Sequence, residues 1–180
     1  MLQLNIDATE LWDEKTNQFI DIKAQTLQLE HSLISISKWE SKWCKSFIST
    51  RDKTYEETID YIRCMTLNED VDPIVYSTLS RKNIEKINSY IEAPMTATHF
   101  YNDKQSSTSR EQITSELIYY WMISAQIPFE CQEWHINRLF TLLRVCNVKN
   151  TPPKKMSKGE IMRRNAALNA QRRQQLNTKG

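Results

Sequence analysis

Glycine is nearly absent from this chain, which has only Gly159 and Gly180 among its 180 residues. Loops that cradle nucleotide phosphates need several glycines at short, fixed spacings, so this class of site is excluded. Few glycines and five prolines also leave little material for tight turns, which favours helices over a β-barrel. The GxSxG and HExxH motifs are missing as well. We therefore predict a protein that is not an enzyme and needs no cofactor.

No stretch of the sequence is apolar for long enough to cross a bilayer. The densest run, Leu117 to Ile123, has seven residues, whereas a transmembrane helix needs about 20. Acidic residues interrupt every apolar run near the N-terminus, so a secretory leader is not expected. These features predict a cytoplasmic protein without a membrane partner.

The four cysteines are scattered and form no CxxC pair, so we interpret them as reduced and structural. Cys131 and His135 stand four residues apart, a spacing that can place two metal ligands on one helix face. Zinc takes four protein ligands in structural sites and three in catalytic sites, and a second closely spaced pair is missing. We interpret these residues as a core cysteine beside a half-buried histidine, and we predict no metal site.

Carboxylates gather at Glu56, Glu57 and Asp60, and again at Asp70 and Asp72. Paired carboxylates in one cleft can perform acid–base chemistry. The first three lie opposite the apolar positions of a predicted helix, however, and the last two lie in a predicted turn. A solvated helix face and a helix cap therefore explain both groups.

Charge is distributed unevenly along the chain. Residues 1–150 contain 16 Lys and Arg against 21 Asp and Glu, a balance of −5, and residues 151–180 contain 8 against 1, a balance of +7. Two prolines, Pro152 and Pro153, stand at the change. This pattern predicts a single globular domain over 1–150, followed by a basic linker and tail over 151–180 that is partly helical or flexible.

The fold class predicted for the domain is α+β, mostly α. Residues 2–6 and 26–31 alternate apolar and polar side chains, and residues 10–20 have the pattern of a hairpin with its turn at 13–17. We therefore expect an antiparallel sheet of about three strands within residues 1–31 and a helical bundle over 32–150. Because so few strands are marginal in water, a helix should cover one face of the sheet.

Apolar spacing and capping residues predict the helices. Ile36, Trp39, Trp43 and Phe47 should form the buried stripe of the first helix, with both tryptophans in the core. Thr54 and Glu57 form a capping box for a helix that ends near Leu67, with Tyr55, Ile59, Ile62 and Met65 or Thr66 inward. Asp72 should cap a short helix beginning at Pro73, and Ser80 a helix over 81–93 that buries Ile84, Ile87 and Ile91.

The most apolar part of the sequence predicts a helical hairpin at the centre of the core. Its first helix begins at Thr108 or Thr114 and should be covered on several sides, with Trp121 buried. Its second helix should run from about Pro128 to Val148 and pack antiparallel to the first. In the tail, Ser157 and Glu160 form a second capping box before a helix that has too few apolar residues to bury much area.

The tail supplies the candidate partner-binding residues: Lys154, Lys155, Lys158, Arg163, Arg164, Arg172 and Arg173. Such side chains can neutralise nucleic-acid phosphates or contact an acidic protein. Aromatic residues, which would stack on bases, are not interleaved among them. We therefore favour a protein partner for the tail over a nucleic acid.

Distinctive stretches lie at 29–43, 60–66, 94–98, 118–123, 128–132 with 134–135, 144–147, 152–157 and 164–173, spread along nearly the whole chain. They resemble one protein family encoded among the tail genes of long-tailed, siphovirus-type bacteriophages. The resemblance implies a tail assembly chaperone. Such proteins coat the helical, aggregation-prone tape measure protein while the tail tube polymerises, and then leave.

For this chain, the resemblance implies the tape measure protein as partner, with self-association as a further option, and no catalytic residues. It also implies that the protein stays in the host cytoplasm and is absent from the mature virion. Two alternatives remain open. One is a minor head–tail or tail protein that stays in the virion, and the other is a nucleic-acid-binding protein that acts through the basic tail.

Overall fold

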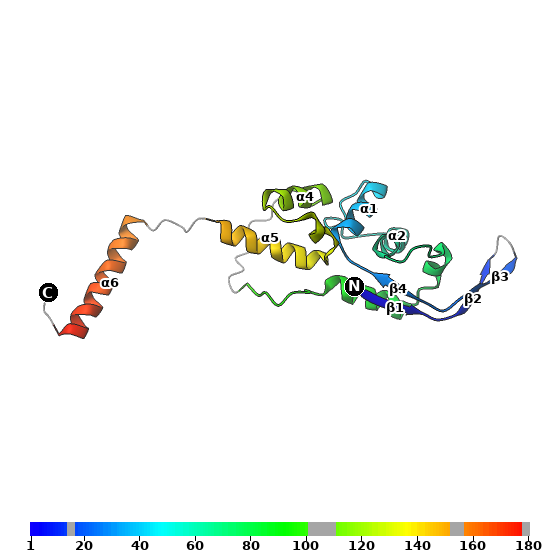
Figure 1. Ribbon diagram of the computed structural model, residues 1–180, viewed down its shortest axis with the longest axis horizontal. Coiled ribbons are helices and arrows are strands. Elements are labelled where there is room, and N and C mark those ends of the chain that lie inside the picture. The colour runs from blue at the N-terminus through cyan, green and yellow to red at the C-terminus, as the bar shows by residue number, and fades with distance from the viewer. Residues whose placement is uncertain (14–16, 101–110, 152–156, 178–180) are drawn as a thin grey trace. The chain divides into compact units, whose positions relative to one another are not determined.

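The computed structural model describes residues 1–13, 17–100, 111–151 and 157–177. The chain divides into two compact units, Met1–Asn147 and Val148–Gly180. Strands come first and helices follow, as Figure 1 shows. The predicted fold class, α+β with mostly helix, is confirmed.

The strands form a two-stranded antiparallel ribbon. They are β1 (Leu2–Ile6), β2 (Thr9–Asp13), β3 (Gln18–Ile22) and β4 (Gln25–Leu29). β1 pairs with β4 and β2 pairs with β3, and one hairpin register continues from Leu2 opposite Leu29 to Trp12 opposite Phe19. The prediction of about three strands is wrong, because the hairpin at 10–20 supplies two strands in addition to those on either side of it.

The β1–β4 half of the ribbon turns one apolar face inward. Along both strands, buried side chains alternate with exposed or half-buried ones, as the two-residue period of a strand requires. The buried residues are Leu4, Ile6, Leu27 and Leu29. Because only one face of this half is apolar, the helices must cover that face.

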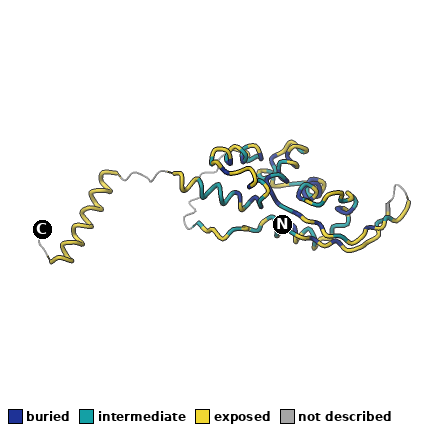
Figure 2. The backbone as a smooth tube through the Cα atoms, in the orientation of Figure 1, coloured by how far each residue is buried: buried dark blue, intermediate teal, exposed yellow. Residues whose placement is uncertain are grey.

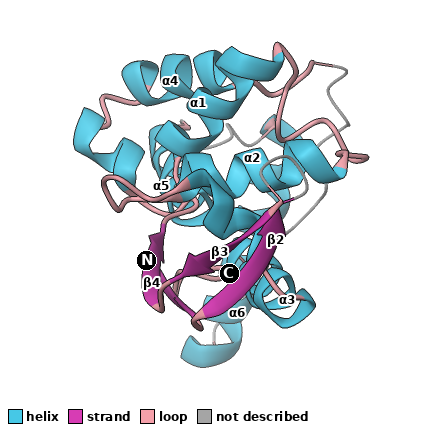
Figure 3. Cartoon of the chain, turned by 90° about the vertical axis from the view of Figure 1, so that its right-hand side faces the viewer, coloured by secondary structure: helices cyan, strands magenta, loops and turns pink. Residues whose placement is uncertain are grey.

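Helices α1 (Leu33–Trp43) and α2 (Tyr55–Met65) pack against each other and share one apolar core with the strands, and Figure 3 shows them on one side of the strands. The capping box of Thr54 and Glu57 is present in α2. The inward positions predicted for α2 are buried, except Tyr55, which is 70% exposed. The prediction for Tyr55 is wrong, because a side chain on the apolar side of a helix is buried only where another element packs over it.

The chain after α2 lies along the free edge of β4. The Leu67 N–H donates to the Gln28 carbonyl over 2.8 Å, and the Asn68 side chain accepts from the Gln28 N–H over 2.6 Å. The 3-10 helix η1 (Pro73–Thr78) follows, capped by Asp72 as predicted. α3 (Arg81–Glu92) begins after its predicted cap Ser80 and packs against β1, with Ile87 buried and Ile84 and Ile91 half-buried.

α1 ends earlier than the apolar spacing predicts. Cys44 adopts a left-handed conformation with φ of 50°, and its N–H donates to the Glu40 carbonyl, an arrangement that terminates helices. Phe47 therefore lies beyond the helix rather than on its stripe. Its ring still packs edge-on against Trp39, with 5.2 Å between the ring centroids.

Two buried carboxylates join α1 to α2. Glu57 accepts from the Lys45 ammonium over 2.6 Å, and Asp60 accepts from the Lys42 ammonium and from the Trp43 indole N–H. The hydrogen bonds from Lys45 and from the Thr54 backbone lower the pKa of Glu57. The predicted solvated face is thus wrong for Glu57 and Asp60, which are 1% and 7% exposed, because the end of α1 and the residues just after it supply partner groups.

The predicted central hairpin is replaced by three pieces. α4 (Ser115–Ser124) begins at the cap Thr114, the 3-10 helix η2 (Phe129–Glu133) follows, and α5 (Ile136–Asn150) begins after a break. The prediction of one continuous second helix is wrong, because Trp134 is extended and ends η2. α4 and η2 both pack against α1.

The helix α6 (Lys158–Leu176) forms most of the second unit. It opens with the predicted capping box of Ser157 and Glu160, and all its residues are exposed, as Figure 2 shows. Its intrinsic helix propensity and its cap, rather than burial, define this helix. Within the described residues, none of the helices has the length and apolar character needed to span a membrane.

Candidate partner-binding surfaces

A buried carboxylate fixes the position of α4. Glu40 of α1 is 7% exposed, and its two oxygens accept the N–H groups of Ser115 and Phe47, each over 2.7 Å. Ser115 is the first residue of α4, where unpaired backbone N–H groups and the helix dipole favour a negative charge. The carboxylate therefore orients α4, whose Ile118 and Met122 are buried.

A pair of buried histidines fixes the start of α5. The Ile136 N–H donates to the His31 carbonyl over 2.7 Å, and the rings of His31 and His135 lie 5.1 Å apart in a T-shaped arrangement. His31 Nδ1 is hydrogen-bonded to the Tyr61 hydroxyl of α2. His31 lies two residues after Leu29, the last residue of β4, so this cluster ties the ribbon, α2 and α5 together.

Burial keeps this cluster uncharged. It lowers the pKa of His31 to about 3, with further contributions from the nearby His135 and Lys53, and it also lowers the pKa of His135. Burial raises the pKa of Tyr61 well above its ordinary value. Neutral side chains of this kind are suited to joining elements, because they pack without the cost of burying a charge.

Cys131 and His135 do not form the metal-ligand pair that their spacing allows. Cys131 lies in η2, whereas His135 precedes α5, so the two residues do not share a helix. His135 uses both ring nitrogens: Nδ1 accepts from the Asn137 N–H over 3.3 Å, and Nε2 donates to the Tyr90 carbonyl over 3.0 Å. Both residues are buried, which agrees with the interpretation of a core cysteine, while the histidine is more deeply buried than predicted.

The outward side of α4 and the adjoining residue of η2 form an incompletely covered apolar surface. We call it the α4–η2 surface, and it consists of Tyr119, Tyr120, Ile123 and Phe129. Tyr120, Ile123 and Phe129 are 63%, 60% and 54% exposed. Tyr119 is half-buried and links the two elements, since its ring lies 6.3 Å from that of Phe129 and its hydroxyl donates to the Gln132 side chain.

Carboxylates border this surface. Glu116 is exposed and lies four residues before Tyr120, so it shares the outward side of α4. Glu130 and Glu133 are exposed on η2 beside Phe129. An apolar patch with a charged border is the usual composition of a protein-binding site.

The α4–η2 surface overturns the prediction that α4 is covered on several sides. Seven consecutive apolar residues indicate all-round burial only if neighbours exist on every side, and α4 packs mainly against α1. Trp121 is half-buried rather than buried. The run itself is apolar on every side of the helix, so the sequence does not show which side of α4 stays open. Phe129 joins this surface only through the tertiary fold.

The predicted basic residues divide into two groups. Lys154 and Lys155 lie outside the described residues. Along α6, successive residues turn by about 100°, so the remaining side chains point around the whole helix. They are Lys158, Arg163, Arg164, Arg172 and Arg173, and all are exposed. The structure thus places them on one helix but does not bring them together on one face.

Removing α6 should leave the first unit folded. We expect truncation after Asn150 to shift the thermal midpoint by no more than a few degrees, which corresponds to about 1 kcal/mol, because every residue of α6 is exposed. Calorimetry of the truncated and full-length proteins measures this shift. Loss of a cooperative transition in the truncated protein would contradict the assignment of α6 to a separate unit.

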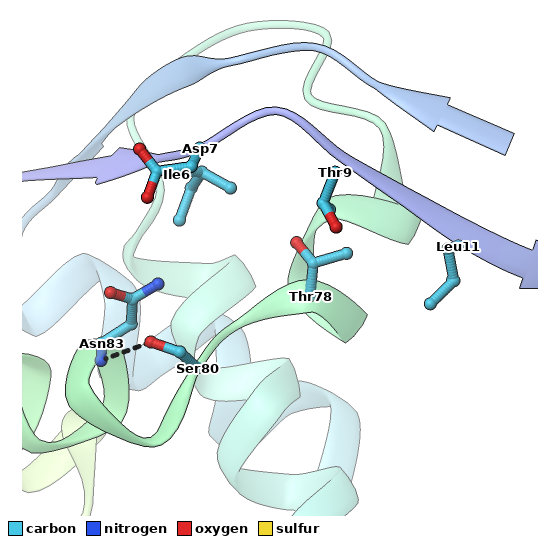
Figure 4. A pocket seen from close by; sticks show the side chains of 7 residues that line it. All are labelled: Ile6, Asp7, Thr9, Leu11, Thr78, Ser80 and Asn83. Atoms are coloured by element: carbon cyan, nitrogen blue, oxygen red, sulfur yellow. Dashed lines mark hydrogen bonds between the residues drawn. The ribbon is translucent and has the colours of Figure 1, made fainter.

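A small pocket lies where the ribbon crosses η1 and the start of α3. Figure 4 shows its lining, with Thr9 of the ribbon facing Thr78 and with Ser80 beside Asn83. The Ser80 hydroxyl accepts from the Asn83 N–H over 3.2 Å, so it is already used to cap α3. The arrangement is that of a packing junction between the ribbon and the helices.

Comparison of the chain with known proteins gives no match to any family model, to any curated protein or to any solved structure.

Proposed function

We propose that this protein is a bacteriophage tail assembly chaperone that binds the tape measure protein during tail morphogenesis. The observation that supports this proposal best is the α4–η2 surface, on which three large apolar side chains are more than half exposed. Exposed apolar residues grouped on one side of a helix favour binding of another protein.

The surface is suited to an apolar client because hydrogen bonds hold its two elements in position. Glu40 holds the first turn of α4, and the hydroxyl of Tyr119 holds η2 through Gln132. Aromatic side chains on a fixed frame lose little conformational entropy when a partner covers them. A helical client with apolar side chains every three or four residues can pack against Tyr120 and Ile123, which have the same spacing.

The basic helix α6 supports the same function in a different way. Its described residues carry five Lys and Arg against one Glu, a balance of +4. Charge of this kind speeds the capture of an acidic client without requiring a shaped site. The distribution of its arginines around the helix fits a sequence-tolerant contact, because no single orientation is needed.

Co-expression with the tape measure protein tests this proposal. The wild-type chain should keep fragments of that protein soluble, and the triple variant Tyr120→Ser, Ile123→Ser, Phe129→Ser should fail to do so. The matched control is Tyr55→Ser, which removes an equally exposed aromatic from a different part of the first unit. Equal solubilisation by the wild type and the triple variant would refute a role for this surface.

Mass spectrometry of purified virions distinguishes the chaperone from a minor head–tail or tail protein. A chaperone should be absent from mature particles, whereas a structural protein should be present at a fixed copy number. Binding to DNA or RNA that weakens steeply with salt would instead favour the nucleic-acid alternative, since phosphate contacts release counterions.

A further inference from the structure

The β2–β3 half of the ribbon has an outer face that is separate from the α4–η2 surface. Because residues directly opposite in a ladder share a face, Trp12 and Phe19 lie together, and so do Glu10 and Asp21. Between these two pairs along the strands lies the pair of Leu11 and Ile20, whose half-buried side chains are on the other face. The four outward residues, Glu10, Trp12, Phe19 and Asp21, are here called the ribbon face.

Two aromatic rings at one end of this face are exposed to solvent. Trp12 and Phe19 pack edge-to-face with 4.9 Å between their centroids, yet they remain 48% and 65% exposed. The contact between the rings orients them, so both are held on the same side of the ribbon. Trp is the best aromatic partner for a cation and is common at the centres of binding sites.

Two carboxylates follow the rings along the strands. Glu10 and Asp21 are directly opposite and both exposed, an arrangement that destabilises a ladder because like charges repel. Among the described residues, neither carboxylate takes part in an ion pair. Lys23 is exposed beside them and, with Glu10 and Asp21, lines a shallow recess on this side of the ribbon.

We propose that the ribbon face binds an arginine side chain of a partner protein. Successive residues on one face of a strand are separated by about 7 Å, so a guanidinium group can contact the carboxylates with its N–H groups and the Trp12 ring with its plane. Arginine makes both contacts with one group, whereas the lysine ammonium is a point charge. The cation also relieves the repulsion between Glu10 and Asp21.

This proposal does not depend on the proposed function, since the ribbon face shares no residue with the α4–η2 surface. The favoured occupant is an extended basic segment of a partner. The positive charge of this segment complements the opposed carboxylates. The backbone of the segment needs no shaped groove, because its arginine side chain makes the contacts.

A peptide titration of the full-length, 15N-labelled protein tests the proposal by NMR. The probes are the blocked peptide acetyl-Gly-Arg-Gly-Arg-Gly-amide and two analogues with lysine or neutral citrulline in place of arginine. We expect the arginine peptide to shift the Trp12 indole N–H signal and the amide signals of the ribbon face. The lysine peptide should bind at least about fivefold more weakly, because it lacks the planar fork, and citrulline should give no saturable shift.

Two variants and a matched control complete the experiment. Glu10→Gln with Asp21→Asn should weaken binding of the arginine peptide at least about tenfold, and Trp12→Ala should do the same. Glu69→Gln with Asp70→Asn removes two exposed carboxylates from a turn elsewhere in the first unit and should leave the affinity unchanged. Unaltered spectra outside the ribbon will show that each variant is folded.

Three results would overturn the proposal. The first is equal binding of the arginine and citrulline peptides, which would make the contact apolar. The second is a similar loss of affinity in the control and in the Glu10→Gln, Asp21→Asn variant, which would make it an effect of net charge alone. The third is a concentration-dependent shift of the Trp12 signal without peptide, which would identify a second copy of the chain as the occupant.

Discussion

Replacing Trp39 by alanine should lower the free energy of unfolding by about 3–5 kcal/mol, the range for truncation of a large buried aromatic. Trp39 is fully buried. Its ring packs against those of Trp43 and Phe47, and its indole N–H donates to the Glu57 carbonyl over 2.9 Å. The substitution therefore leaves a cavity between α1 and α2 and removes the hydrogen bond that joins the two helices through the Glu57 carbonyl.

The size of this effect decides whether the variant folds. Domains commonly have 5–15 kcal/mol of stability, so the loss consumes about a third or more of a typical value. Urea denaturation followed by circular dichroism measures it, with an unchanged dependence on urea as the sign that the folded state is otherwise intact.

Trp121→Ala is the matched control for Trp39→Ala. Trp121 is half-buried on α4, so its truncation should cost clearly less, about 1–2 kcal/mol, as for an average substitution. Similar losses in the two variants would mean that α4 is as deeply packed at Trp121 as α1 is at Trp39.

The second large effect is a loss of stability in mild acid. In the folded protein, burial lowers the pKa of His31 to about 3, whereas the unfolded chain has the ordinary value near 6.5. As pH falls below 6.5, the unfolded state takes up a proton that the folded state does not, so stability is lost until about pH 3. Between pH 7 and pH 5, His31 alone should cost about 2 kcal/mol.

His135 adds to this loss, because burial lowers its pKa as well. The titratable groups that face the pair are Tyr61 and Lys53 beside His31, and Tyr90, Glu30 and the N-terminal amine beside His135. The pKa of Glu57 is lowered from about 4.5, so its contribution is lost only at lower pH. The change in stability between pH 7 and pH 5 therefore reports on the histidines rather than on Glu57.

Urea denaturation at pH 7, 6 and 5 measures this dependence. His31→Gln removes the titrating ring but keeps a side chain that can hydrogen-bond to Tyr61, so it should flatten the dependence by about half. An equally steep loss of stability in His31→Gln would show that other groups, rather than this cluster, take up the protons.

Sequence patterns correctly predicted those features that depend only on residues close together in the chain. The capping boxes of Thr54 with Glu57 and Ser157 with Glu160 are both present, because each is completed within one turn of its own helix. The same holds for the cap Asp72 and the alternation along the β1–β4 strands. Helix ends were less predictable: the left-handed Cys44 terminates α1 without a glycine.

The candidate surfaces were predicted only in part. The basic residues of α6 could be named from the sequence, since exposure follows from a helix with few apolar positions. The α4–η2 surface could not, because a run that is apolar on all sides does not reveal which side its neighbours leave open. The ribbon face required the register that places Glu10 opposite Asp21, and a shift of one residue would have separated them.

Composition and local periodicity by themselves thus determined the fold class, most helix starts and the basic character of the tail. These properties depend on interactions between residues a few positions apart, which the sequence displays directly. Only the tertiary structure decided that Glu57 and Asp60 are buried, that Glu40 holds α4 and that His31 meets His135. Each of these contacts joins residues far apart in the chain, and it exists because burial made a polar partner necessary.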